Sequence, residues 1–124
     1  MKQHYPMMSL LESKAMLILW KHRTCCVHMV KTELESEKKM AYTTVQTIME
    51  RLVNKGMAKK HQVDKTAVYT PVITKAAYAA SLTSSLMHLL ISQYDEVLIP
   101  SLIKGLSLLD KKQLRKITSH FKVL

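Results

Sequence analysis

Hydrophobic residues recur at helical spacing in three segments of the first half of the chain, which predicts three helices. The first covers residues 9–22, where Ser9 and Glu12 fit a capping box and Trp20 is a candidate core anchor. Its expected apolar stripe consists of Leu11, Ala15, Ile18, Leu19 and His22. The second helix is expected over residues 26–37, where three glutamates make it a poor candidate for lying against phosphates.

The third predicted helix, residues 43–55, has one apolar and one polar face. Thr43 and Gln46 match a capping box, and Gly56 suits the left-handed residue that closes a helix. The apolar face comprises Val45, Ile48, Met49, Leu52 and Val53. The opposite face carries Thr43, Thr44, Gln46, Thr47, Glu50 and Arg51.

The pattern changes to a period of two after Gly56, which predicts a β-hairpin over residues 57–72. Its two runs, 57–63 and 66–72, flank Asp64 and Lys65, and Pro71 fits near the end of an edge strand. Basic residues lie at the tip and flank of this hairpin: Lys59, Lys60, His61 and Lys65.

The second half of the chain is expected to be helical throughout. Thr74 can cap a long helix to about Tyr94, followed by the apolar segment 97–106, in which Pro100 lies near the first turn or introduces a kink. Asp110 and Gln113 predict a capped final helix. The apolar residues proposed for dimerisation are Tyr78, Leu82, Leu86, Leu89, Leu90, Leu98, Leu102, Ile103 and Leu106.

Composition supports this helical assignment and adds a strong positive charge. The 124 residues include only two glycines, and 19 Lys+Arg against 9 Asp+Glu give a net charge of +10. Such a balance indicates nucleic acid as the first candidate partner and an anionic membrane surface as the second. A soluble basic protein without a polyanionic partner is the alternative. Because both halves carry excess charge, the charge does not locate the site.

The sequence shows no targeting segment, no membrane span, no cofactor motif and no catalytic motif. Its longest apolar stretches are far shorter than a membrane span, so a cytoplasmic location is expected. Cys25 and Cys26 are adjacent, and with His22 and His28 they suggest a metal site. The usual zinc spacing is absent, so two buried small residues at the start of a helix are the preferred interpretation, and no metal is expected.

Three helices followed by a basic hairpin form the winged-helix pattern, which predicts a mainly α fold with a small β-hairpin wing. Residues 1–73 would form a winged helix-turn-helix domain for DNA, and residues 74–124 a helical dimerisation region. A recognition helix buries one face and offers short polar side chains to base edges, as the face from Thr43 to Arg51 does. Glu50 opposes this interpretation, since a carboxylate repels phosphate unless it lies off the groove or binds a cytosine amino group.

The segments MAYTTVQTIMERLVNKGMAKK and AVYTPVI resemble the penicillinase-repressor family (the BlaI/MecI/CopY type). The resemblance covers residues 9–73 well, and over the tail only the layout fits. The positions that match the family pattern are Thr44, Val45, Thr47, Arg51, Leu52, Lys55, Gly56, Tyr69 and Pro71, with Leu19-Trp20 upstream.

The resemblance implies a homodimer that represses transcription at a pseudo-palindromic operator. It places Thr44 and Thr47 toward the groove, Arg51 on the phosphate side and Gln46 at the variable base-reading position. Lys59, Lys60 and Lys65 become candidates for phosphate contacts. A winged-helix module that binds protein instead of DNA is the alternative, and an enzyme is a distant third class.

The chain departs from the family pattern at several places. Met40-Ala41-Tyr42 replaces Trp-Ser-Pro, which predicts a helix that begins later, at Thr43, and a different operator. The paired Cys-x-Cys motifs of the copper-responsive branch are absent. In another branch a membrane sensor-protease cuts the tail. The region Leu102–Leu106 lacks the Asn-Phe bond associated with that cut, so such a partner is carried over from the family alone.

Overall fold

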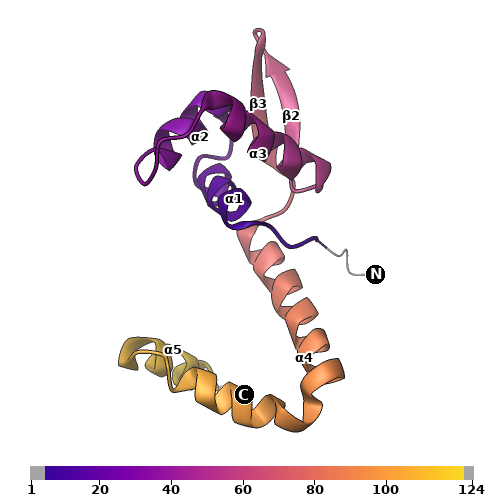
Figure 1. The fold of residues 1–124 in the computed structure, drawn as a ribbon, viewed down its shortest axis with the longest axis vertical. Helices are drawn as coiled ribbons and strands as arrows, with labels where there is room; N and C mark the ends of the chain where they lie inside the picture. The colour runs from indigo at the N-terminus through magenta and orange to yellow at the C-terminus, as the bar shows by residue number, and fades with distance from the viewer. Residues whose placement is uncertain (1–4, 122–124) are drawn as a thin grey trace. The chain divides into compact units, whose positions relative to one another are not determined.

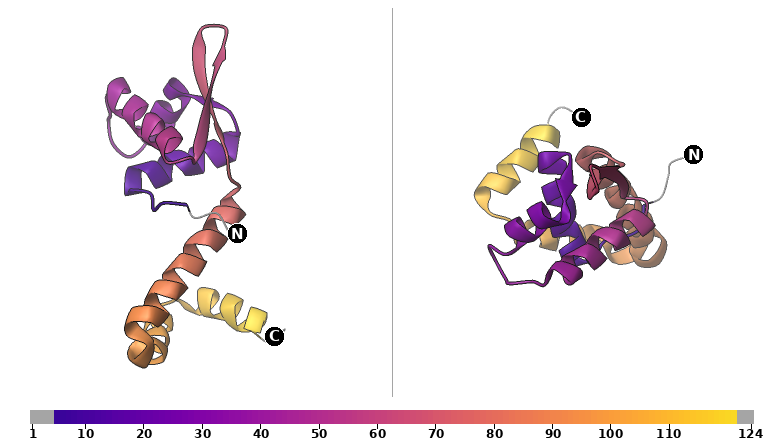
Figure 2. Two further views of the ribbon diagram at one scale, coloured as in Figure 1. Left: turned by 90° about the vertical axis from the view of Figure 1, so that its right-hand side faces the viewer. Right: turned by 90° about the horizontal axis from the view of Figure 1, so that it is seen from above.

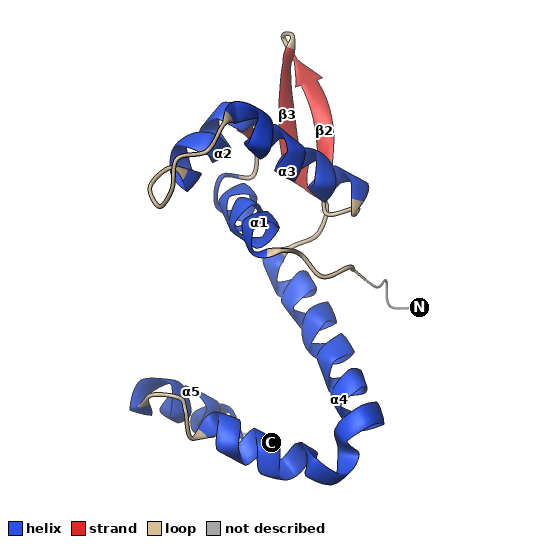
Figure 3. Cartoon of the chain, viewed as in Figure 1, coloured by secondary structure: helices blue, strands red, loops and turns tan. Residues whose placement is uncertain are grey.

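The computed structural model describes residues 5–121 (Figure 1). Internal contacts divide the chain into two units, residues 1–83 and residues 84–124. Helices dominate, and the strands belong to the first unit (Figure 3). The elements are α1 (Leu10–His22), β1 (Cys25–Cys26), α2 (Val27–Leu34), α3 (Tyr42–Asn54), β2 (Ala58–Val63), β3 (Thr66–Pro71), α4 (Lys75–Leu106) and α5 (Lys111–Phe121).

Helix α1 confirms the predicted start at Ser9. The Ser9 hydroxyl accepts a hydrogen bond from the Glu12 N–H at 3.2 Å. The predicted stripe is partly wrong, because Leu11 and His22 are not buried. The residues of α1 that are buried are Glu12, Ala15, Met16, Ile18 and Leu19.

One hydrophobic core holds the first unit together. Tyr69 and Met16 are among its fully buried side chains, and Trp20 packs against it as expected. The first turns of α4 belong to the same core, since Tyr78 is 9% exposed and Leu82 packs against it. Burying side chains of this size stabilises the fold by roughly 1.5–3 kcal/mol each.

The wing is part of a three-stranded antiparallel sheet, where the sequence predicted a two-stranded hairpin. The strand order is β1-β3-β2, so β3 is central and the edge position expected for Pro71 is wrong. Pro71 is tolerated because the short β1 pairs only with Tyr69 and Val68. Asp64 and Lys65 both have positive φ and join β2 to β3 in a tight turn, as predicted (Figure 2).

Helix α3 begins one residue earlier than predicted. Ala41 is its N-cap and no side chain caps it, so the capping box assigned to Thr43 and Gln46 is wrong. Its end is as predicted: Gly56 has φ +76° and donates to the carbonyl of Val53, while the Met57 N–H reaches the carbonyl of Leu52. These two bonds form a Schellman motif.

Helix α2 is shorter than the predicted 26–37. It ends at Leu34, and residues 35–38 form hydrogen-bonded turns. Cys25 and Cys26 precede it as strand β1, so their assignment to a helix start misses the pairing with β3. Cys25 is buried and Cys26 half-buried.

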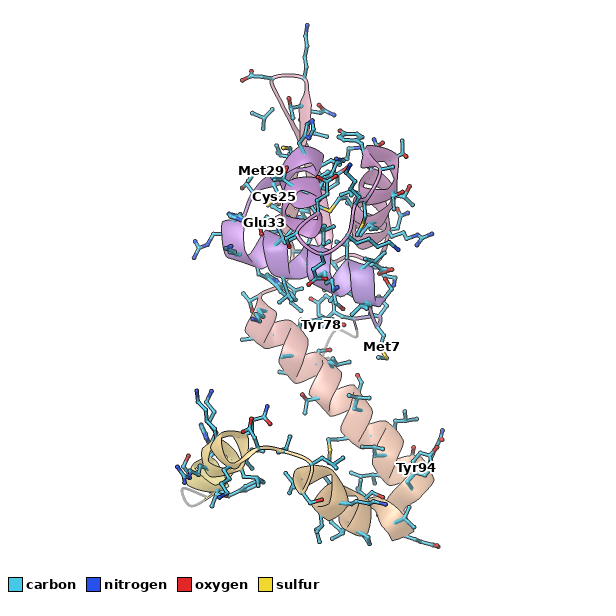
Figure 4. All side chains as sticks on the ribbon, turned by 60° about the vertical axis from the view of Figure 1, so that its left-hand side comes forward. Met7, Cys25, Met29, Glu33, Tyr78 and Tyr94 are labelled. Carbon is cyan, nitrogen blue, oxygen red and sulfur yellow. The ribbon has the colours of Figure 1, made fainter. Side chains whose placement is uncertain are left out.

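The predicted caps of both tail helices are confirmed. The Thr74 hydroxyl accepts from the Ala77 N–H at 3.1 Å, and Asp110 accepts from the Gln113 N–H at 2.8 Å. Helix α4 is interrupted by a kink at Tyr94, the predicted end of the long helix, where the backbone is non-helical with φ −130° and ψ 21°, and helical structure resumes from there to Leu106. Figure 4 labels Tyr94 at this bend.

Candidate nucleic-acid interface

The polar face of α3 is exposed along its length. Val45, Ile48, Met49 and Leu52 fix the orientation of the helix by packing into the core. The residues predicted to meet DNA all lie on the exposed side: Thr43, Thr44, Gln46, Thr47 and Arg51. The Thr47 hydroxyl donates to the carbonyl of Thr43 at 2.9 Å, so its hydrogen is committed to the helix and its methyl group is the part available for contact.

All three predicted lysines of the wing are exposed, but they differ in their ion pairs. Lys59 and Lys65 are exposed and form no ion pair among residues 5–121. Lys60 differs, because its ammonium lies 2.8 Å from a carboxylate oxygen of Glu50 on α3. The structure therefore pairs one of the three candidate phosphate contacts within the chain.

Glu50 links α3 to the wing. Its Oε1 accepts from Lys60 and, also at 2.8 Å, from the hydroxyl of the buried Tyr69. The hydrogen bond from Lys60 and the one from Tyr69 lower the pKa of Glu50. Burial and the bond to Glu50 raise the pKa of Tyr69. The carboxylate that opposed DNA binding in the sequence is thus compensated.

Most other acidic side chains of the first unit are also paired. Glu12 is nearly buried and lies 2.6 Å from the ammonium of Lys55. The remaining pairs are Glu33 with His22 and Lys21, Glu35 with Lys31, and Glu37 with Lys14. The cations of this unit without an ion pair among the described residues are Arg23, Lys38, Lys39, Arg51, Lys59, Lys65 and Lys75. The charge excess therefore falls partly on α3 and the wing.

The start of α3 has an aromatic neighbour in place of a capping side chain. Tyr42, the first residue of α3, is 44% exposed and packs edge-on against the ring of His28, with the ring centres 5.6 Å apart. The sequence indicates only that Tyr42 replaces the proline of the family pattern. The contact with His28 could not be found from spacing, because the two residues lie on different helices.

The residues predicted for dimerisation fall into two groups. Tyr78 and Leu82 pack within the first unit, where the centre of the Tyr78 ring lies 6.0 Å from that of Trp20. In the second unit Leu98 is buried, and Leu90 and Leu106 are half-buried. The exposed members are Leu86, Leu89, Leu102 and Ile103.

The two cysteines differ in burial, since Cys25 lies in the core and Cys26 is half-buried. The Cys25 thiol lies 3.9 Å from the carbonyl of Ile18, and burial followed by the charge of Glu33 raises the pKa of Cys25 to about 11. Figure 4 shows Cys25 and Glu33 on the same side of the unit. Among residues 5–121 no group of three or more His, Cys, Asp or Glu is arranged to hold a metal, and no helix is long and apolar enough to cross a membrane.

Comparison with known proteins identifies the family. A model of the family described as penicillinase repressor matches residues 8–120. The chain belongs to the penicillinase repressor family. A member from Bacillus licheniformis, named penicillinase repressor, is 33% identical over 73 residues. That alignment covers 59% of this chain and 57% of the relative, so the chain spans little more than half of the length of that protein.

Solved structures agree with the penicillinase repressor assignment. The DNA-binding domain of the repressor BlaI matches with a TM-score of 0.53 and 33% identity, covering 63% of this chain and 94% of that one. Monomeric B. licheniformis BlaI in complex with the blaP half-operator matches with a TM-score of 0.52 and with the same identity and coverage. RosR of H. salinarum, 17% identical, covers 93% of this chain and 91% of its own with a TM-score of 0.52, which is a likeness of fold alone.

Proposed function

We propose that this member of the penicillinase repressor family represses transcription by binding a pseudo-palindromic operator as a homodimer. Residues 1–73 would bind DNA, with α3 in the major groove and the wing on the backbone. The observation that carries the proposal is the exposed face of α3, from Thr43 to Arg51, whose opposite face is fixed in the core. Family membership and the solved BlaI–half-operator complex support it.

Each part of this interface has the chemistry that its role needs. Gln46 can form two hydrogen bonds with adenine, and the methyl groups of Thr44 and Thr47 can meet the methyl group of thymine. Arg51, Lys59 and Lys65 supply positive charge for phosphates, which provides most of the affinity and the register. No step of this function needs a cofactor or an enzymatic reaction.

Dimerisation is assigned to residues 74–124. The observation behind it is the set of exposed apolar side chains on α4, including Leu86, Leu89, Leu102 and Ile103. A second copy would remove these side chains from water, at about 25 cal/mol per Å² of apolar surface. Sedimentation at micromolar concentration tests this part, and a stable monomer would refute it.

Two further expectations concern release from DNA and location: the first rests on the family alone, and the second on the short apolar stretches of the sequence. Release by a membrane sensor-protease would require a cut in the tail, and the region Leu102–Leu106 lies within helix α4. Co-expression with a candidate protease, followed by mass measurement of the chain, tests this. A cytoplasmic location stays a prediction, which cell fractionation checks.

DNA binding itself is tested by titrating DNA from upstream of the protein's own gene with the full chain. We expect saturable binding whose affinity falls steeply as salt rises, because several phosphates are neutralised. Binding that is absent at low salt would refute the proposal and would favour the alternative of a protein-interaction module.

A further inference from the structure

The contact between α3 and the wing has a polar element that the fold alone does not require. Glu50 comes from α3, whereas its two donors come from the wing, Lys60 on β2 and Tyr69 on β3. Both donors reach the same oxygen, Oε1, at 2.8 Å. A carboxylate held by two converging donors is restricted in position, so it restrains the elements that supply the donors.

The chain connects α3 to the wing only through the turn at Lys55 and Gly56. Apolar side chains of α3 also share the core with Tyr69, and the hydrogen bonds to Glu50 add a polar connection to that packing. Tyr69 is fully buried in the central strand of the sheet, so its hydroxyl is a fixed point. The Lys60 ammonium also lies 6.0 Å from the centre of the Tyr69 ring, at the outer limit of a cation–π contact.

Lys60 differs from the other wing lysines, Lys59 and Lys65, because its charge is paired within the chain. Glu50 and Lys60 compensate each other, and both side chains are about 40% exposed, at 40% and 38%. Lys59, adjacent to Lys60 on β2, has no ion pair among the described residues. The wing therefore offers phosphate two uncompensated lysines, Lys59 and Lys65.

We infer that Glu50 is a positioning residue that fixes the wing on the recognition helix, and that Lys60 serves as its counter-ion instead of binding phosphate. This inference rests on the proposed DNA binding and extends it. It assigns Glu50 a role in specificity: by holding the wing at one angle and occupying one lysine, Glu50 limits binding to unrelated DNA. Without Glu50, Lys60 is released to any phosphate within reach.

The salt dependence of DNA binding by the full chain shows whether Glu50 acts by pairing with Lys60 or by contacting DNA itself. The probes are a duplex from upstream of the protein's own gene and an unrelated duplex of equal length. Each phosphate contact contributes about 0.9 to the slope of log affinity against log salt. Glu50→Gln should steepen the slope by about 0.9 and raise affinity for the unrelated duplex about fivefold at 0.15 M salt.

Two variants make the interpretation unambiguous. The double variant Glu50→Gln, Lys60→Met should return the slope to that of the unaltered chain, because it removes the lysine released by the first change. Lys59→Met is the matched control, which should make the slope shallower by about 0.9. The inference is overturned if Glu50→Gln leaves the slope unchanged, or if the double variant is shallower than the unaltered chain.

A thermal measurement without DNA tests the positioning contact by itself. Glu50→Gln and Tyr69→Phe each weaken one side of the same hydrogen bond, so their combined effect on Tm should be smaller than the sum of the single effects. Additive changes in Tm would contradict an energetic contribution of the contact between Glu50 and Tyr69. If the unaltered chain binds neither duplex, the proposed DNA function fails, and this cycle still decides whether Glu50 holds the wing.

Discussion

The indole N–H of Trp20 donates a hydrogen bond of 2.8 Å to the backbone carbonyl of Ile73. Trp20 lies near the end of α1, and Ile73 lies between β3 and α4. The indole ring also packs against Tyr78 in the first turn of α4. One side chain thus anchors both the exit from the wing and the beginning of the long helix.

Replacing Trp20 with Phe should separate the hydrogen bond from the packing. The smaller ring can still contact Tyr78, but the carbonyl of Ile73 loses its partner, which costs about 1–3 kcal/mol of unfolding free energy. Urea unfolding followed by circular dichroism measures this, since the change removes the chain's single tryptophan. Phe121→Leu, at an aromatic that is 63% exposed, is the control. Equal stability of both variants would show that the bond contributes nothing.

The two glycines should respond in opposite directions to substitution by alanine. Gly56 has φ +76° and open space around the position of a Cβ, so Gly56→Ala should cost about 1–2 kcal/mol through backbone strain alone. Gly105 lies within α4, also in open space, and Gly105→Ala should stabilise the helix by about 0.5–1 kcal/mol. Thermal unfolding of both variants measures the difference. A stabilising Gly56→Ala would contradict the assigned helix end.

Local signals predicted several of these features, and long-range contacts account for what was missed. Ser9, Thr74 and Gly56 act within a few residues of their own helix, so spacing alone locates them. Strand β1 consists of two residues whose partner lies over forty positions away, at Tyr69. The start of α3 at Tyr42 has no capping side chain, so the sequence carries no local signal for it. From the sequence, Glu50 is expected to repel phosphate. Its two hydrogen-bond donors, Lys60 and Tyr69, lie on the wing, so spacing along α3 does not reveal that its charge is compensated.

The ion pair of Glu12 should make stability depend on pH. Burial raises the pKa of Glu12, but hydrogen bonds from Lys55 and Ser9 outweigh it and lower the pKa overall. A carboxylate with a lowered folded-state pKa contributes stability above its unfolded pKa, about 4.3, and loses it as pH falls through the folded value. Unfolding free energy should therefore decrease below about pH 4.3.

Glu12→Gln tests this assignment directly. At pH 7 it should cost about 1–3 kcal/mol of unfolding free energy. Its loss of stability between about pH 5 and pH 3, the range in which carboxyl groups titrate, should be shallower than that of the unaltered chain. Glu35→Gln, in a half-buried pair with Lys31 within one stretch of chain, is the control with a smaller effect. Identical pH profiles for the Glu12 variant and the unaltered chain would contradict the role of Glu12.

The two cysteines should differ in reactivity toward thiol reagents. With its pKa raised to about 11 by burial, roughly one Cys25 thiol in ten thousand is ionised at pH 7. Cys26 is half-buried and should react first. Mass spectrometry of Cys25→Ser and Cys26→Ser after timed alkylation measures each thiol separately, and both should react at equal rates in denaturant. Faster native labelling of Cys25 would be inconsistent with its place in the core.

The proposed DNA-binding function depends on the exposed face of α3, and a double substitution on that face tests it most directly. Thr47→Ala with Arg51→Ala removes a side chain proposed to face the groove and a cation proposed to contact phosphate, without touching the buried face. Thr83→Ala with Lys104→Ala, on α4, is the matched control. In a titration of DNA from upstream of the protein's own gene, we predict that the α3 variant loses operator binding while the control binds as the unaltered chain does. Undiminished binding by a folded α3 variant would contradict the assignment of α3 as the recognition helix.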